Sequence, residues 1–534
     1  MTGKRPTISS IKGMVASAHP HASMAGVRLL RAGGNAFDAI AAVAAALNVV
    51  EPYMSGLAGM GMATCYVAKE RRMRTLDFIT RVPEKFNAKG LKRSDVARGP
   101  MAIGTPANLA GWCELVKSHG TKPLAEIFAP AIELARDGFP VTENNAAYIA
   151  QANSELKGFP AFYGDWLKTY TDGKGGMPAG NILKQPDLAR TYEAIAAEGP
   201  GYLHGGPLGR EIVAHLKTLG GVLTDNDFAT AKPLWLEPLF AEYRGLKVHT
   251  LPPPCEGFQF LMTLQILDGF DLGKLERNGV EHIDTVMRAI RLAGIERINS
   301  NNPPAAKLVE LMGEGTIKRL RARVRDGKPI QGPAEQFPEA EPVVAGVDRE
   351  HTTSFCVADR EGNVVHITQS LGAGFGSGVV VPGRGVALNN FLYWGELNPK
   401  GTNYMRGGGP LALPMAPSVS TRDGKPVLSL GTPGSYGICQ TQVQALVQHV
   451  DFKLPIQEAI DAPRLRLMDG SEAWCEARVS EKVRSELVKR GHDVKTLEDY
   501  TMKVGGMHGI AIDQRTGAMT GGADPRRDGY ALPV

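Results

Sequence analysis

The sequence lacks the long hydrophobic segments that would place a chain in or across a membrane. Its longest apolar run, Ala39–Val50, falls short of the roughly 20 residues that a helix needs to cross a bilayer. The opening stretch MTGKRPTISSIKGMVASAHPHAS contains no continuous apolar core of the kind that secretory signals use. We therefore expect a cytoplasmic protein with no membrane partner.

Cysteine is scarce, and basic charge is not concentrated. The six cysteines stand far apart without CxxC spacing, which argues against a disulfide framework or a zinc site. The formal net charge of +5 comes from interspersed basic and acidic residues, so nucleic acid is not an expected partner. No histidine pair has HExxH spacing, and we expect no metal.

Several well-known catalytic signatures are also missing. The absence of GxxxxGK[ST] argues against a P-loop kinase or ATPase. The glycine-rich stretches GLAGMG and GAGFGSG do not form GxGxxG between a strand and a helix. PGSYG and FGSG each miss the first glycine of the serine-hydrolase elbow GxSxG. The absence of these motifs therefore excludes several enzyme classes but does not identify the function.

The sequence contains enough hydrophobic residues for a large core, and it divides into a helix-rich part and a strand-rich part. Its 534 residues are 43% hydrophobic and 22% charged, which is typical of a soluble globular protein. Roughly the first 330 residues are rich in helix signals, and residues 326–347, with four prolines, indicate a loop or linker. Strands and glycine-rich turns follow from Thr352. This order favours layered packing, with helices over both outer faces of sheets.

Local signals predict individual elements within these stretches. Residues 23–52 contain two predicted helices broken at Gly33 and Gly34, with Asn35 or Asp38 starting the second. The second is apolar on all sides, so we expect it to be buried. Thr352–Ala358 and Val364–Ser370 are predicted to form a β-hairpin around the turn DREGN.

The start of this hairpin, His351-Thr352-Thr353, suggests a chemical role. A threonine at a chain terminus carries its own base, because its α-amine titrates near 7.7–8.0 in model peptides and is partly neutral at physiological pH. Such a terminus requires cleavage between His351 and Thr352, and the same hydroxyl could perform that cut. Thr-Thr is also common at an ordinary strand start, so the residues alone leave both interpretations open.

A series of longer stretches follows one another in a specific order: GMVASAHPHASMAGVRLLRAGGNAFDAIAAVAAALNVVEPYMSGLAG, AIGTPANLAGW, PAIELARDGFPV, YRGLKVHTLPPPCEGF, HTTSFCVADREGNVVHITQSLGAGFGSG, ALNNF and LGTPGSYG. In these stretches and their order, the chain resembles the γ-glutamyltranspeptidase family of N-terminal-nucleophile hydrolases over nearly its whole length. The resemblance implies an α+β fold, a four-layer αββα sandwich of the N-terminal nucleophile hydrolase type. It also implies a precursor that cleaves itself before Thr352. The large subunit would be residues 1–351, ending in a flexible linker of about 326–351, and the small subunit 352–534, both interwoven as one globular body.

The resemblance also assigns catalytic roles, none of which needs a cofactor. Thr352 becomes the nucleophile that forms an acyl-enzyme, and Ser370 aligns with a second hydroxyl that is usually threonine. Gly434 and Ser435 align with two residues, usually both glycine, whose N–H groups form an oxyanion hole. A backbone donor survives the change to serine unless that position needs positive φ. Both precede a helix predicted to begin near Ile438, where N–H groups point toward negative charge.

The polar residues with which the family binds glutamate are replaced. The family's arginine position is Ile79, and Arg81, two residues further on the same strand face, could substitute for it. Trp394 replaces an acidic residue, Gly372 an asparagine, and Leu413-Pro414 a serine pair.

These replacements predict an apolar acyl pocket lined by Phe391, Tyr393, Trp394 and Leu413. Such a pocket suits a small-molecule amide whose acyl part is apolar, aromatic, or a small acid without the amino-acid head. The alternative is that the aromatic rings only fill space left by lost side chains.

The sequence thus predicts a self-processing N-terminal threonine amidohydrolase. One alternative is a genuine γ-glutamyltransferase or glutathione hydrolase that binds glutamate through Arg81. Another is a homologue that never matures and acts as a binding protein. The identity of the amide, hydrolysis against transfer to an amine, and assembly into a homo-oligomer stay open.

Overall fold

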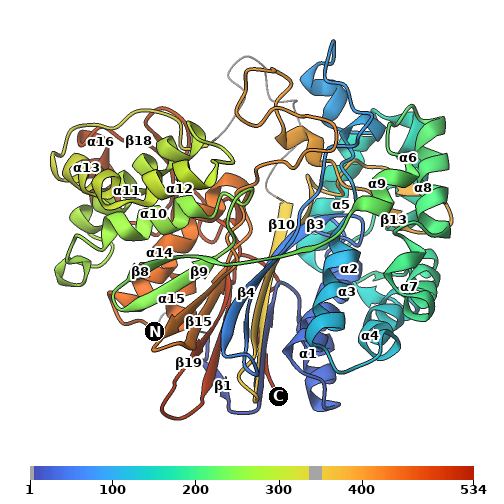
Figure 1. Cartoon of the computed structure of the whole chain (residues 1–534), viewed down its shortest axis with the longest axis horizontal. Helices are drawn as coiled ribbons and strands as arrows, with labels where there is room; N and C mark the ends of the chain where they lie inside the picture. Colours follow the sequence, from blue (N-terminus) through green and yellow to red (C-terminus); the bar gives the residue numbers. More distant parts are fainter. Residues whose placement is uncertain (1–4, 336–350) are drawn as a thin grey trace.

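The computed structural model describes residues 5–335 and 351–534, and it is built in four layers (Figure 1). Two seven-stranded sheets lie face to face in the middle, and helices cover the outer face of each sheet. This arrangement confirms the predicted αββα sandwich. The predicted linker of about 326–351 lies mostly outside the described residues.

One sheet carries the predicted hairpin at its centre. All of its strands pair antiparallel. Their order is β21 (Tyr530–Pro533), β2 (Gly13–Ser17), β10 (His351–Asp359), β11 (Val364–Gly372), β3 (Met60–Val67), β4 (Arg72–Phe78) and β7 (Leu234–Leu236). Strands from before and after His351 are therefore neighbours. The division into subunits at this residue stays a prediction.

The second sheet is also antiparallel and mixes early and late segments. Its order is β1 (Ile8–Ser10), β20 (Met519–Ala523), β19 (His508–Ile512), β15 (Lys425–Gly431), β14 (Ser418–Arg422), β9 (Leu246–Thr250) and β8 (Leu239–Tyr243). A smaller sheet joins β16 (Leu465–Leu467), β17 (Glu472–Glu476) and β18 (Asp493–Leu497).

The helices form the two outer layers. On the right of Figure 1 lie α1 (Pro20–Arg31), α2 (Ala36–Val50), α3 (Asn108–His119), α4 (Leu124–Asp137), α5 (Glu143–Leu156), α6 (Pro160–Tyr170), α7 (Pro186–Glu198), α8 (Pro207–Thr218) and α9 (Asp225–Thr230). On the left lie α10 (Phe258–Leu267), α11 (Val280–Ile298), α12 (Ala305–Met312), α13 (Glu314–Arg325), α14 (Ile438–Val450), α15 (Ile456–Asp461) and α16 (Glu481–Lys489). Within the described ranges, no helix combines the length and apolarity needed to cross a bilayer.

The break between α1 and α2 forms as the sequence predicts. Gly33 adopts φ +81, which glycine tolerates without steric cost. Asn35 then caps α2, because its side chain accepts from the N–H of Asp38 while the Asp38 carboxylate accepts from the N–H of Asn35. Every residue of α2 is buried, and Glu51, which follows its last residue, faces the side chain of Thr353 in β10.

The hairpin is fixed to this buried helix at its turn. The carboxylate of Asp359 accepts from the N–H of Asn363 at 2.9 Å and from the N–H of Ala36 at 2.8 Å. These bonds join the turn to the first residue of α2. The hairpin is thus anchored at the end opposite Thr352.

A polar contact crosses the space between the two sheets. In β11, His366 bonds through Nε2 to Ser354 Oγ and through Nδ1 to Ser429 Oγ, each at 2.9 Å. Complete burial lowers the pKa of His366 to about 3, so the ring is neutral at physiological pH. The contact joins β10 and β11 to β15 of the other sheet, at a position two residues after Thr352 in the chain.

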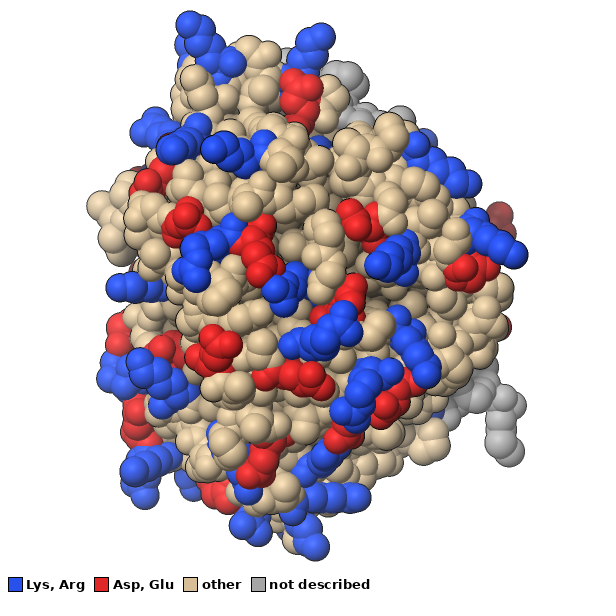
Figure 2. Space-filling view, turned by 90° about the vertical axis from the view of Figure 1, so that its right-hand side faces the viewer, with Lys and Arg blue, Asp and Glu red and all other residues tan. Residues whose placement is uncertain are grey.

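The surface over the right-hand helical layer carries both signs of charge. Lysine and arginine side chains alternate with aspartate and glutamate over this face, which Figure 2 turns toward the viewer. The interspersed charge of the sequence therefore persists on this face of the folded molecule.

Candidate active site

Thr352 lies at an irregularity in the β10–β11 ladder. His351 pairs with Gly372 and Thr353 pairs with Gln369, so Ser370 and Leu371 of β11 both stand opposite Thr352. Such a bulge re-aims the backbone locally. Thr352 is only 5% exposed, and the ring of His351 packs edge-on against Tyr148 of α5 at 5.1 Å.

The structure brings Ser370 to the peptide bond that is predicted to be cut. Its hydroxyl donates to the carbonyl oxygen of His351 at 2.5 Å and accepts from the N–H of Gly372 at 2.8 Å. The second bond directs the hydroxyl proton toward the carbonyl. A donor in this place polarises the carbonyl and would stabilise negative charge that develops on its oxygen.

Gly434 and Ser435 lie in the turn between β15 and α14, and both are buried. Gly434 adopts φ +126 and Ser435 φ +51, so the second position does require the left-handed region. For serine this conformation costs about 1 kcal/mol relative to a right-handed one. The expected condition, that serine keeps the donor only without positive φ, is therefore wrong: Ser435 adopts this conformation and still carries its N–H at the start of a helical segment, where anions are favoured.

Contacts through Arg527 link this turn to Thr352. The glycine backbones show how closely these segments approach. A Cβ atom built on Gly434 would lie 3.5 Å from the Cα of Gly505, and a Cβ atom built on Gly506 would lie 2.4 Å from the Cδ of Arg527. Arg527 in turn donates from Nη1 to the carbonyl oxygen of Thr352 at 2.8 Å. The backbone of Gly505 and Gly506 and the buried side chain of Arg527 therefore lie between the oxyanion-hole candidates and the nucleophile candidate.

Arg527 and Glu51 are the residues that sequence reasoning missed. The Arg527 Nη1 lies 3.5 Å from Glu51 Oε1, with both side chains at most 3% exposed. Burial raises the pKa of Glu51 to about 7, against the opposing charge of Arg527. The sequence signals are weak: a glutamate after an apolar helix and the second arginine of DPRR.

The predicted pocket aromatics lie in a single 3₁₀ turn, Phe391–Trp394, and all are buried. Trp394 lies close to Gly372, since a Cβ atom built on Gly372 would be 3.1 Å from Cζ3 of Trp394. Gly372 pairs with His351, so Trp394 is near the predicted cleavage site. Gly372 has φ +105, so both space and conformation favour glycine there. The ring of Tyr393 packs at right angles to Trp394, with centroids 5.8 Å apart.

Asn403 connects this turn to the segment of Leu413. Its amide nitrogen donates to the carbonyl oxygens of Trp394 at 3.3 Å and Ala412 at 3.0 Å, and its oxygen accepts from the N–H of Ala412. Leu413 is 1% exposed and donates its N–H to the carbonyl of Pro254. A contribution of Leu413 to the acyl pocket stays a prediction.

Arg81 lies beside Asp77 and Ile79 in a small recess just beyond β4. The prediction that Arg81 and Ile79 share a strand face is wrong, because the strand ends at Phe78. Its carbonyl accepts from the N–H of Thr105 at 2.9 Å, and its backbone pairs with Pro410. Burial raises the pKa of Asp77, and the charge of Arg81 opposes that rise. Substrate binding by Arg81 stays a prediction.

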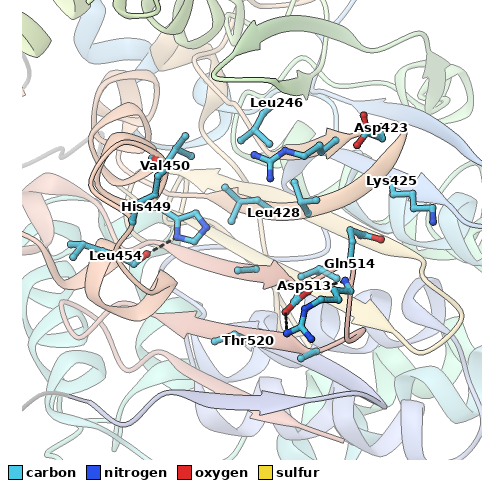
Figure 3. Close-up of a pocket in the computed structure, with 17 residues that line it drawn as sticks. Leu246, Asp423, Lys425, Leu428, His449, Val450, Leu454, Asp513, Gln514 and Thr520 are labelled. Atoms are coloured by element: carbon cyan, nitrogen blue, oxygen red, sulfur yellow. Dashed lines mark hydrogen bonds and ion pairs between the residues drawn. The ribbon is translucent and has the colours of Figure 1, made fainter. Parts of the chain in front are cut away.

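A larger surface pocket lies away from these groups (Figure 3). It adjoins Lys425 at the start of β15, whereas Gly434 follows the end of that strand. His449 bonds through Nδ1 to the carbonyl of Leu454 at 2.7 Å at its wall. It contains no residue that the sequence assigned to a site, and Arg422, Lys425 and Arg515 on its rim are exposed.

The chain is similar to known proteins over almost its whole length. The family model described as Gamma-glutamyltranspeptidase matches residues 22–534. The chain is 33% identical to the acylase ACY 1 proenzyme of Pseudomonas sp. (strain SE83), over 99% of this chain and 95% of that protein. It is 30% identical to the glutathione hydrolase proenzyme of Bacillus subtilis (strain 168), over 98% of this chain and 91% of the relative.

A solved structure extends the likeness to the whole fold. The crystal structure of cephalosporin acylase from Bacillus halodurans matches with a TM-score of 0.90 at 29% identity, covering 100% of this chain and 98% of that one. The predicted N-terminal nucleophile hydrolase fold is thereby confirmed. The chain therefore belongs to the gamma-glutamyltranspeptidase family, whose members are amide hydrolases and acyltransferases.

Proposed function

We propose that the protein is a self-processing amidohydrolase whose nucleophile is Thr352, the first residue of a small subunit. The observation that carries the proposal is the bond from the Ser370 hydroxyl to the carbonyl of His351 at 2.5 Å. It places a proton donor on the carbonyl that self-cleavage would attack. The relatives named proenzymes support a precursor that is cut.

Self-cleavage would proceed through an ester. Thr352 Oγ attacks the carbonyl carbon of His351, the Oγ–C bond forms, and the C–N bond breaks as the hydroxyl proton passes to the leaving nitrogen. Ser370 stabilises the charge on the carbonyl oxygen during this step. Water then hydrolyses the ester, which leaves a carboxylate on His351 and a free amine and hydroxyl on Thr352.

The matured Thr352 would then act on an external amide. Its α-amine takes the hydroxyl proton, Oγ attacks the substrate carbonyl, and the N–H groups of Gly434 and Ser435 stabilise the oxyanion. Loss of one such donor typically costs about 100- to 1000-fold in rate. The amine of the substrate leaves with the proton, and water resolves the acyl-enzyme.

The buried aromatic turn supports an acyl group without an amino-acid head. Trp394 stands where the family carries an acidic residue, and it lies against Gly372 beside the cleavage region. A polar ammonium buried there without its partners would cost several kcal/mol. The relatives named acylases support cleavage of an amide, and the aromatic turn favours an acyl part that is apolar, aromatic or a small acid without the amino-acid head.

Maturation tests the proposal most directly. On a denaturing gel we expect two fragments from the wild type, an uncut chain from Thr352→Ala, and slow cutting by Ser370→Ala. Ser370→Thr keeps the hydroxyl and should cut like the wild type. A wild-type chain that stays intact during long incubation, or a Thr352→Ala chain that cuts normally, would contradict the proposal.

A second candidate is hydrolysis of γ-glutamyl amides, which the glutathione hydrolase relative and the position of Arg81 beside Asp77 favour. Matched anilides of γ-glutamate, glutarate and a simple aliphatic acid separate the two, since glutarate lacks the α-amine. We expect kcat/KM to be higher for an acyl group without that amine. A strong preference for γ-glutamyl anilide, lost in Arg81→Gln, would favour the second candidate.

A further inference from the structure

The turn that carries Arg527 is anchored on both sides of that residue. On one side, the Asp524 carboxylate pairs with Arg464 and accepts from the N–H of Met507 at 2.8 Å. Arg526 contacts the same carboxylate at 3.1 Å and pairs with Glu476 of β17 at 2.5 Å. These ionic groups are completely or almost completely buried. Arg526 also donates to the carbonyl of Ile460 in α15, so these groups hold the turn against α15 and β17.

On the other side, Asp528 binds the start of α5. Its two carboxylate oxygens accept from Thr142 Oγ1 at 2.7 Å and from Asn144 Nδ2 at 2.8 Å. Thr142 is the N-cap of that helix. The turn therefore bridges the two helical layers, and Arg527 is held between them.

The Arg527 side chain reaches from this fixed turn to the bulge. At the bulge the β10–β11 register shifts, and β10 pairs with β2 only from Cys356 onward. Arg527 supplies the carbonyl of Thr352 with a charged donor at 2.8 Å. Its packing against Gly506 leaves no room for a Cβ there, so the guanidinium is confined by contacts as well as by charge.

Glu51 stands behind the guanidinium. It follows the last residue of α2, which is wholly buried, so its carboxylate has a fixed place relative to β10. The charged and titratable groups that face it are Arg527, Asp528 and Tyr53. The Thr353 hydroxyl of β10 also faces the carboxylate and lowers its pKa, although Oε2 makes no hydrogen bond of ordinary geometry among the described residues. A buried carboxylate with one incomplete ion pair is costly, which argues for a role beyond packing.

We propose that Arg527, backed by Glu51, is a positioning residue that fixes the main chain of Thr352 for self-cleavage and for catalysis. The inference rests on the proposed function, because it assigns a task to the Thr352 backbone. Arg527 acts through Thr352, so its loss should lower the rate of bond breaking and leave substrate affinity nearly unchanged.

The test uses the full chain with Arg527→Gln, Arg527→Lys and Glu51→Gln. Timed denaturing gels give the rate of self-cleavage, and kcat and KM are measured per matured small subunit. A hydrogen bond from a charged donor is worth about 1.5–3 kcal/mol, so we expect Arg527→Gln to slow both reactions about 10- to 100-fold. Arg527→Lys keeps a charged donor and should recover part of the loss, with KM unchanged throughout.

Arg384→Gln is the matched control, because that arginine forms a partly exposed ion pair with Glu211 far from the bulge. It should mature and turn over like the wild type. If Arg527→Gln fails to fold by circular dichroism, the isosteric Glu51→Gln decides the question. A slower cut and a lower kcat at unchanged KM support the inference, and wild-type rates overturn it.

Failure of this inference can be distinguished from failure of the proposed function. A wild type that matures, together with an Arg527→Gln chain that matures and turns over within about twofold of it, overturns this inference alone. A wild type that never matures overturns the proposed function and this inference together.

Discussion

At the scale of single residues, the site depends on where a few donors lie around one peptide bond. Ser370 and Arg527 donate to two successive carbonyls, those of His351 and Thr352. The sequence could predict Ser370, because the family resemblance aligns it with a second hydroxyl near the nucleophile. It could not predict Arg527, which lies 175 positions away along the chain and carries no local signal.

Ser435 gives a prediction at this scale. Ser435→Gly keeps the backbone N–H and removes the conformational cost of φ +51. The free energy of unfolding should therefore rise by about 1 kcal/mol, while kcat stays near the wild-type value. Thermal unfolding and steady-state kinetics measure the two quantities.

Ser435→Ala is the control for the hydroxyl, because alanine keeps the strained conformation. It should show no gain in stability. If glycine and alanine both lower kcat strongly, the hydroxyl itself takes part in the reaction and the proposed role of the N–H is insufficient.

At the scale of elements, patterns that repeat locally were predictable. The capped α2, the β10–β11 hairpin and the start of α14 at Ile438 all agree with the sequence, because each depends on neighbours within a few residues. The bulge at Thr352 was not predictable, since it is a shift in register between β10 and β11 that the residue pattern of neither strand marks. Trp394 was placed by its motif, but its contact with Gly372 arises from tertiary packing.

A cluster that joins α11 to the segment after α16 gives a prediction about pH. The Asp284 carboxylate accepts from Arg288 at 2.9 Å, from Arg490 at 3.0 Å and from His492 at 2.7 Å. Although burial opposes it, these bonds lower the pKa of Asp284 from 3.8 to about 2. A lowered acid pKa stabilises the fold above pH 3.8, and that contribution is lost as pH falls toward 2.

Asp284→Asn should therefore lower the free energy of unfolding by on the order of 2 kcal/mol at neutral pH. The difference from the wild type should shrink as the pH is lowered from about 4 toward 2. Urea titrations at several pH values measure it, with Glu193→Gln on the exposed face of α7 as the control. A difference that stays constant with pH would show that the carboxylate charge is not the cause.

At the scale of the whole molecule, the two sheets bind the proposed subunits together. In the sheet that contains the hairpin, β10 lies between β2 and β11, and β11 lies between β10 and β3. Strands from before and after His351 are therefore hydrogen-bonded to each other. The four layers were predictable from the family resemblance. The interleaving of particular strands depends on pairings between distant segments, which local patterns do not specify.

This interleaving predicts that the cut chain does not fall apart. After maturation, the two fragments should elute together in gel filtration and should separate only in denaturant. The reason is that separation would expose the β2–β10 and β3–β11 ladders and the core between the layers. Elution of two independent fragments from native buffer would contradict the interwoven arrangement.

The contact between Arg527 and the Thr352 carbonyl also bears on timing. A ribosome releases Thr352 long before residue 527, and the turn that holds Arg527 forms only when both helical layers are in place. If Arg527 sets the geometry of the bulge, a nascent or half-folded chain cannot cut itself efficiently. The break before Thr352 would then act as a completion signal, made only after synthesis and folding have brought the late turn to the early strand.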